Sequence, residues 1–469
     1  MSSSKSFNSS YIIGISFISA LGGYLFGFDF AVISGALPFL RTQFVLTPVW
    51  EGFLTGSLAL GCIVGCLLAG NIADKYGRKP GLILAALIFA VSSIGIAFSA
   101  SLTYFLILRF AAGIGVGMAS MLCPMYIAEV SPAEVRGRNV AINQLTVVIG
   151  ILITNLVNYY LADKNLDAIH WMLGLGLSKS SYTFLRDIEP WRWMFGMGAV
   201  PSAIFLIGVT WLPESPRWLM KSGQLDKAKV ILNKIGSPDF AEATFKAVEK
   251  SLIGSTKQSY AMVFEKAVRP AVVVGITLAV FQQFCGINVV FNYTSTIFES
   301  VGANLNRQLF ETVAIGVVNL VFTLLAMWQV DKLGRRPLML WGSLGLSVLY
   351  IVLAFLLQNH FPAGLVSIFV LLAISTYAIS LAPVTWVLIS EIFPNKIRGV
   401  ASSVAIVSLW GAYFILVFTF PILAKILGAY GPFYLYAGIC FAGFLFVKVK
   451  VKETKGQTLE ELEDNLIRH

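Results

Sequence analysis

The chain has 469 residues, of which 57% are hydrophobic and only 12% are charged, and its mean hydropathy is +0.79. So few charges cannot cover the surface of a protein in water, which excludes a soluble protein and indicates an outer surface that faces lipid. The net charge of +10 follows from membrane insertion, so we expect no nucleic-acid partner.

A helix that crosses the hydrocarbon core of a bilayer needs roughly 20 apolar residues. Twelve such runs occur along the chain, separated by polar loops. They are residues 11–39, 53–72, 80–100, 102–127, 140–161, 193–212, 271–298, 313–330, 338–357, 364–389, 400–422 and 430–447. We therefore predict an all-α membrane protein with twelve transmembrane helices in the lipid bilayer.

Basic residues are distributed unevenly between the two faces that an even number of spans creates. One face collects 26 of the 34 lysines and arginines, the other collects 7, and Arg109 alone lies inside a span. The positive-inside rule assigns the richer face to the cytoplasm. We expect a multi-pass protein of the plasma membrane, or of the inner membrane in a bacterium, with both termini cytoplasmic.

Two loop motifs occur twice. Residues 73–80 read ADKYGRKP and residues 330–337 read VDKLGRRP, and the Glu129 to Arg136 loop has a counterpart from Glu391 to Arg398. This repetition predicts two six-helix repeats with a shared cavity between them that opens to either side in turn. The predicted units are a bundle over 1–212, a cytoplasmic linker with short amphipathic helices over 213–269, a second bundle over 270–449 and a cytoplasmic tail over 450–469.

Acidic and basic side chains in the repeated loops can pair between neighbouring helix ends and hold the cytoplasmic face shut. We predict a cytoplasmic gate of ten charged residues. They are Asp74, Arg78, Glu129, Arg136, Glu214, Arg217, Asp331, Arg335, Glu391 and Arg398. The alternative is that these loops serve only topology and solubility.

Six motifs appear in an order and spacing that resemble those of the sugar porters of the major facilitator superfamily. They lie at residues 70–80, 126–138, 213–219 (with PESPR), 282–288 (QQFCGIN), 331–337 and 390–398. The resemblance covers nearly the whole chain and extends to bacterial proton-coupled xylose and hexose symporters and to animal facilitative glucose transporters. It implies the major facilitator fold and transport of a monosaccharide by alternating access. Residues 452–456 read KETKG where the family usually has PETKG, and the loop over 162–192 is long.

The seventh span carries three amides that are suited to a sugar. Gln282, Gln283 and Asn288 lie on either side of Gly286, where a loosened helix can turn neighbouring side chains inward. Amides donate and accept hydrogen bonds as sugar hydroxyls do. The alternative is that they join helices, each amide contributing about 0.6 kcal/mol.

The resemblance implies further sugar ligands in other spans. They are Gln144, Asn319, Trp386 and Trp410, with Phe26 lining the cavity and Tyr293, at the outer-gate position of the family, also counted among the substrate-binding residues. Three positions depart from the family. Leu409 stands where an amide is common before the tryptophan, Asn292 replaces the first of two adjacent tyrosines, and Ile151 replaces a second glutamine of some pentose carriers. We expect these departures to alter gating or substrate preference.

Two charged residues lie well inside apolar spans, Asp29 and Arg109. Each would cost about 2.5 to 3.5 kcal/mol in isolation, so we expect them to pair. Protonation of Asp29 would release the pair, and the resemblance to proton-coupled porters favours symport, since facilitative animal carriers typically have asparagine there. The alternative is a permanent ion pair that fixes helix register.

Other function classes are less favoured. The chain shows no nucleophile elbow, phosphate-binding loop or metal-ligand spacing, so we expect no enzyme activity, no cofactor and no metal site. The Gly113–Gly117 stretch lies in a span and favours close helix contact over nucleotide binding. A facilitative uniporter, a polyol carrier and a non-transporting sugar sensor remain open, and we expect the protein to work as a monomer.

Overall fold

A computed structural model describes residues 7–453 of the chain apart from 163–188, 254–259, 267 and 394–396. Twelve helices in this part of the chain are long and apolar enough to cross a membrane. The prediction of an all-α protein with twelve spans is therefore confirmed. Most of the loop over 162–192 and of the tail over 450–469 lies outside the described residues.

The helices follow one another in the order of the predicted spans. The first group comprises α1 (Ser9–Phe44), α2 (Pro48–Tyr76), α3 (Arg78–Ala97), α4 (Leu102–Val130), α5 (Ala133–Ala162), α8 (Pro190–Gly196) and α9 (Ala199–Trp211). Short linker helices follow as α10 (Pro216–Lys221), α11 (Leu225–Ile235), α12 (Pro238–Ile253) and the 3-10 helix η1 (Tyr260–Phe264). The second group comprises α13 (Arg269–Phe284), α14 (Ile287–Asn292), α15 (Thr294–Glu299), α16 (Leu305–Leu333), α17 (Arg335–Gln358), α18 (Ala363–Ile379), α19 (Leu381–Ile392), α20 (Arg398–Leu427) and α21 (Gly431–Lys450).

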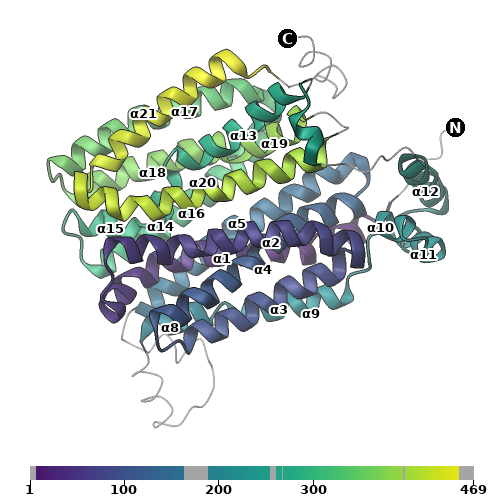
Figure 1. Ribbon diagram of the computed structural model, residues 1–469, viewed down its shortest axis with the longest axis horizontal. Helices are drawn as coiled ribbons and strands as arrows, with labels where there is room; N and C mark the ends of the chain where they lie inside the picture. The colour runs from purple at the N-terminus through teal and green to yellow at the C-terminus, as the bar shows by residue number, and fades with distance from the viewer. Residues whose placement is uncertain (1–6, 163–188, 254–259, 267, 394–396, 454–469) are drawn as a thin grey trace, which may run out of the picture.

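Within each group the helices pack against one another. In the first, α1 contacts α4, α5 and α9, and α2 contacts α4; in the second, α17 contacts α18 and α21, and α13 contacts α19 and α20. The start of α1, the end of α21 and the helices α10–α12 all lie at the same end of the molecule (Figure 1). We call this end the terminal face and the other end the opposite face.

Glycines allow close contact between α2 and α4. A Cβ atom on Gly113 would lie 2.2 Å from the carbonyl oxygen of Leu58, and one on Gly117 would lie 2.3 Å from that of Cys62. Such approaches exclude any side chain. The Gly113–Gly117 stretch is therefore a helix-packing surface, as the sequence analysis favours.

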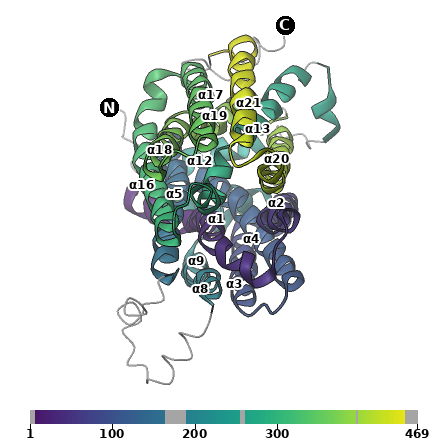
Figure 2. The same ribbon diagram turned by 90° about the vertical axis from the view of Figure 1, so that its left-hand side faces the viewer.

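The two groups meet along α2 and α20 and along α5 and α16 (Figure 2). Asn155 on α5 donates a hydrogen bond to the carbonyl oxygen of Thr312 on α16 at 2.7 Å, and Ser295 on α15 donates to the carbonyl oxygen of Ser34 on α1 at 2.6 Å. Both contacts lie in the halves of these helices next to the opposite face. The groups are thus held together on the side away from the termini.

Several helix boundaries differ from the sequence expectation, and two of them show why. Helix α2 begins at Pro48 rather than Phe53, because Thr47 caps it by accepting a hydrogen bond from the backbone N–H of Trp50. The predicted span over 364–389 is broken at Ser380 into α18 and α19, with φ −122° and ψ −86° at that residue. The division of the chain into four units stays a prediction.

Candidate functional site

A break in the seventh span sets the positions of its amides. Gly286 separates α13 from α14 with a φ of +87°, a left-handed conformation that favours glycine. A Cβ atom there would lie only 2.5 Å from the ring of Tyr436. The break places Gln282 and Gln283 at the end of α13 and Asn288 at the start of α14.

These three amides form a continuous hydrogen-bonded row. Asn288 donates from Nδ2 to Oε1 of Gln283, Gln283 donates from Nε2 to Oε1 of Gln282 at 2.7 Å, and Gln282 donates from Nε2 to the hydroxyl of Tyr377 on α18 at 2.9 Å. All three amides are buried, with 4–7% exposed surface. Their donors and acceptors face one another inside the protein, where a hydroxylated ligand can exchange places with an amide partner.

Aromatic side chains from both groups lie near the middle of the spans. The ring of Phe26 on α1 is 5.5 Å from that of Trp410 on α20, and Trp410 is 5.7 Å from Tyr413. Trp410 is 4% exposed, and in the part of the chain that the structure describes its Nε1 makes no hydrogen bond of ordinary geometry, with only the weakly accepting thiol of Cys66 beside it. A buried indole N–H with only a weak acceptor can donate to an incoming hydroxyl.

The remaining predicted ligands are dispersed. Gln144 on α5 is half-buried, Asn319 on α16 is buried with 6% exposed surface, and Trp386 on α19 is 41% exposed. Within the described residues, none of the three is hydrogen-bonded to the amide row. Tyr293 lies elsewhere, just before α15, and its hydroxyl donates to the carbonyl oxygen of Val417 on α20 at 2.7 Å, within the second group of helices.

Two tyrosines that the sequence analysis did not single out belong to this region. Tyr377 accepts from Gln282, and Tyr413 donates to Oδ1 of Asn292 at 3.2 Å, while Asn292 donates to the backbone carbonyl of Asn288 at 2.7 Å. Asn292, one of the departures from the family, is thereby tied to α20. Tyrosines inside apolar spans are the only signal in the sequence that could have indicated these positions, since a buried hydroxyl needs a partner.

The two intramembrane charges pair as expected. Nη1 of Arg109 on α4 lies 3.2 Å from Oδ1 and 3.4 Å from Oδ2 of Asp29 on α1. The side chains are 1% and 2% exposed, and the guanidinium also stands 5.4 Å from the ring centre of Phe195. Nε of Arg109 has no partner among the described residues, so Nη1 is the nitrogen that contacts the carboxylate.

A clasp at the opposite face was not predicted. We use this name for Arg41, Glu51, Thr296 and Glu299. Arg41 at the end of α1 contacts Glu51 on α2 at 2.6 Å, Glu299 on α15 at 2.8 Å and the hydroxyl of Thr296 at 2.6 Å. Arg41 thus joins the two groups of helices.

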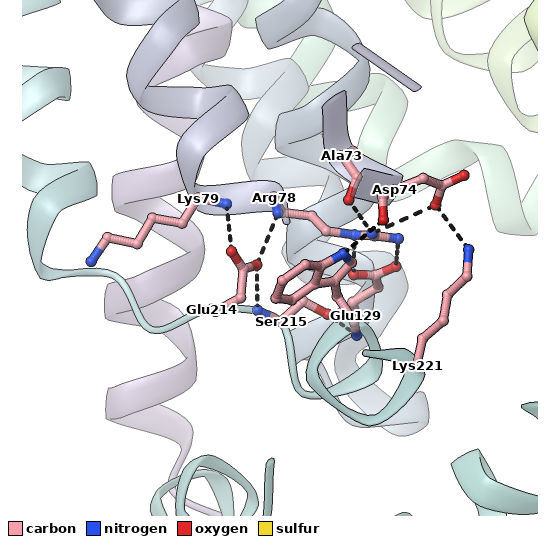
Figure 3. A network of polar contacts seen from close by, with 9 residues as sticks. Ala73, Asp74, Arg78, Lys79, Glu129, Glu214, Ser215 and Lys221 are labelled. Atoms are coloured by element: carbon pink, nitrogen blue, oxygen red, sulfur yellow. Dashed lines mark hydrogen bonds and ion pairs between the residues drawn. The ribbon is translucent and has the colours of Figure 1, made fainter. Parts of the chain in front are cut away.

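A polar network at the terminal face contains four of the predicted gate residues (Figure 3). Arg78 donates to both carboxylate oxygens of Glu129 at 2.8 Å and lies 3.9 Å from Asp74, which Lys221 contacts at 3.1 Å. Glu214 accepts from the backbone N–H of Arg78 at 2.9 Å. Among the described residues the network lies within the first group of helices and α10, and none of its contacts reaches the second group.

The two copies of the repeated loop motif have matching helix caps, each made by a glutamate. Glu214 caps the start of α3, and Glu453 caps the start of α17 by accepting from the backbone N–H groups of Arg335 and Arg336, each at 3.0 Å. At Gly77, which precedes α3 with a φ of +103°, a Cβ atom would lie 2.3 Å from the carboxylate of Glu214. The KETKG segment, although it departs from the family, supplies this second cap.

Two other gate residues, Arg136 and Arg217, are not part of this network. Arg136 makes one long contact of 3.5 Å to the carbonyl oxygen of Ser131, and Arg217 makes no polar contact within the described residues. The side chains of Asp331, Glu391 and Arg398 lie outside the described part.

The chain matches the family model described as "Sugar (and other) transporter" over residues 15–466. It is 36% identical to the D-xylose-proton symporter of Escherichia coli, over 97% of this chain and 96% of the relative. It is 37% identical to the glucose transport protein of Synechocystis, over 97% of both chains.

The fold has a close counterpart among solved structures. The xylose transporter of E. coli in its inward-open conformation superimposes with a TM-score of 0.83 at 35% identity, covering 97% of this chain and 100% of that one. Fold, length and motifs agree along the whole chain. The protein therefore belongs to the sugar porter family of the major facilitator superfamily and is a membrane sugar transporter, not an enzyme.

Proposed function

We propose that the protein imports a monosaccharide, a hexose or a pentose, by alternating access together with a proton. The observation that carries this proposal is the buried Asp29–Arg109 pair, because an ionisable pair inside a membrane span is costly and typical of a proton pathway. The relative in E. coli is a D-xylose-proton symporter, which supports the same reading.

The sugar is held by the amide row and the aromatic side chains. Gln282, Gln283 and Asn288 supply hydrogen bonds, and Trp410 and Phe26 supply apolar faces for the ring carbons. Gln144, Asn319 and Trp386 complete the contacts when the two groups of helices close around the sugar, while Tyr293 acts on the outer side of the site. The hydrogen bonds within the row are then exchanged for bonds to sugar hydroxyls.

The bundles over 1–212 and 270–449 move against each other around this site. The terminal face lies in the cytoplasm, because it carries 26 of the 34 basic residues, and the protein resides in the plasma membrane as a monomer. The clasp of Arg41 and Glu299 closes the outside in this conformation. The ten charged gate residues close the cytoplasmic side in the alternate conformation.

Proton coupling sets a measurable limit on accumulation. One proton that moves down about 100 mV releases about 2.3 kcal/mol, and one pH unit adds about 1.4 kcal/mol. Together these sustain roughly 500-fold accumulation, whereas a uniporter sustains none.

Uptake into proteoliposomes tests the proposal. A panel of hexoses, pentoses and polyols is offered with and without an imposed pH gradient. The proposal expects gradient-driven accumulation of a monosaccharide. Equilibration without accumulation identifies a uniporter, preference for polyols identifies a polyol carrier, and binding without counterflow identifies a sensor.

A further inference from the structure

A cavity of about 460 Å³ opens at the terminal face, away from the amide row. It lies between the turn that joins α4 to α5 and the linker helices α10–α12. This volume falls within the range of sites that hold small molecules, roughly 300 to 1,000 Å³.

The walls of the cavity combine an apolar floor with a cationic rim. Leu232, Ile235 and Phe240 form part of the floor and are 2–8% exposed. Arg136 at the start of α5 and Arg217 on α10 line the same cavity, and both are exposed at its rim. An amphipathic anion fits such a surface.

Two of the three carboxylates near these arginines are already engaged elsewhere. Glu129 lines the cavity but is paired with Arg78 through both of its oxygens. Glu214, three residues before Arg217, caps α3. Within the described residues Arg217 has no polar partner, and one carboxylate without a partner, Glu134, lines the cavity.

Two arginines that line one cavity favour a phosphate group, because each planar guanidinium can donate two parallel hydrogen bonds to phosphate oxygens. The excess of basic residues on this face also attracts anions. We propose that the cavity binds a phosphate ester with an apolar or polyol body, which bridges Arg136 and Arg217 and ties α10 to the start of α5. The ester is the headgroup of an anionic lipid or a soluble phosphorylated metabolite.

Binding to the purified full-length protein tests this site without any transport assay, which is necessary because Arg136 and Arg217 also belong to the proposed gate. Thermal unfolding in detergent is followed during titration with glycerol 3-phosphate, with glycerol and chloride at matched ionic strength as controls. Arg217→Gln and Arg136→Gln are each expected to weaken apparent binding about tenfold or more, since a hydrogen bond to a charged group contributes about 1.5 to 3 kcal/mol.

Two changes outside the proposed gate keep the test decisive. Thr244 on α12 lines the cavity, so Thr244→Asp is expected to abolish binding by repulsion, whereas Thr244→Asn is expected to retain it. Glu134→Gln removes the opposing charge and is expected to tighten binding a few-fold. Binding is compared among the variants whose unfolding temperature without ligand equals that of the parent protein.

Retention of lipid by the protein separates the two sources. Native mass spectrometry counts phosphatidylglycerol adducts against phosphatidylcholine adducts in the parent and in Arg217→Gln. Selective loss of phosphatidylglycerol in the variant assigns the site to a lipid headgroup, and stabilisation by glycerol 3-phosphate without that loss assigns it to a soluble ester. If neither ligand responds to Arg217→Gln and Thr244→Asp, the proposal is overturned.

Discussion

Arg109 on α4 lies 3.2 Å from Asp29 on α1, and the residue that follows Asp29 reaches the other group of helices. The ring of Phe30 is 5.7 Å from Phe291 on α14 and 5.8 Å from Tyr413 on α20. Tyr413 in turn holds Asn292 next to the amide row. A change in the Asp29–Arg109 pair can therefore be transmitted through packed aromatic rings to the side chains proposed to hold the sugar.

Arg78 provides the first prediction, on stability. Its side chain is 9% exposed and that of Glu129 is 11% exposed, so Arg78→Gln leaves a largely buried carboxylate without its partner. We expect a loss of about 3 to 5 kcal/mol. Lys221→Gln, which removes a contact to Asp74 from a side chain that is 54% exposed, is expected to cost less than about 1 kcal/mol. Thermal unfolding in detergent measures both, and equal losses would contradict the account.

The clasp provides the second prediction, on conformation. Glu299→Gln removes the ion pair of Arg41 across the two groups and leaves the hydrogen bond of Arg41 to Thr296. Because Glu299 is 58% exposed, the change leaves folding nearly unaffected. If the ion pair contributes about 1 kcal/mol to the closed conformation, its loss shifts the conformational equilibrium about fivefold towards opening of the opposite face. Distances between spin labels at Val45 and Asn306 report this opening.

The matched control for the clasp is Glu189→Gln. It removes a contact of 2.7 Å to Arg192, and both residues belong to the start of α8. The distances between the two spin labels are therefore expected to stay unchanged. A clasp without a gating role would give the same result for both variants.

Gly286 provides the third prediction. Gly286→Ala places a Cβ atom against Tyr436 and forces alanine into a left-handed conformation, which together cost at least about 2 kcal/mol. We expect a lower unfolding temperature and weaker sugar binding. Gly438→Ala on α21, where a Cβ atom meets nothing within 4 Å, is expected to be neutral or stabilising by up to about 1 kcal/mol. A neutral Gly286→Ala would show that the break in the seventh span is not needed.

Gln282 provides the fourth prediction, on the sugar site. Gln282→Ala removes a donor and an acceptor from the amide row and is expected to weaken sugar binding by about 1 to 3 kcal/mol. Tryptophan fluorescence during sugar titration measures the change. The control is Gln358→Ala, because Gln358 is exposed and its side chain is hydrogen-bonded only to Tyr434 among the described residues. Unchanged affinity in Gln282→Ala would remove this residue from the site.

The spans and the intramembrane ion pair could be predicted because both follow from the energetics of lipid. Apolar length marks a span, and Asp29 and Arg109 were the two charges well inside the spans, so each had the other as its natural partner. The amide row was indicated for the same reason, since amides in lipid need partners. The break at Gly286 was visible as a glycine between them.

The clasp could not be predicted, since charges at helix ends can be solvated and nothing in the sequence requires them to pair. Arg41 and Glu299 lie 258 positions apart, and Glu51 stood outside the predicted span because hydropathy does not detect the capped first turn of α2. The break at Ser380 has no adjacent glycine, but Pro383 stands three residues later and has no N–H to donate to the carbonyl oxygen of Ile379, so this proline was the signal that the prediction of an unbroken span missed. Contacts of Tyr377 and Tyr413 depend on how distant helices pack and are not encoded locally.

Asp29 provides the fifth prediction, on energy coupling. Asn at this position cannot take up or release a proton, so Asp29→Asn is expected to lose accumulation driven by the pH gradient. Exchange of sugar across the membrane is expected to persist, because no side chain of the amide row is changed. Exchange also serves as the control for correct insertion of the variant.

The most direct measurement is therefore sugar accumulation in proteoliposomes under an imposed pH gradient, compared between the parent protein and Asp29→Asn. The account predicts uphill uptake by the parent and only equilibration by the variant, with counterflow in both. Accumulation that persists in Asp29→Asn would contradict the assignment of this residue to proton coupling.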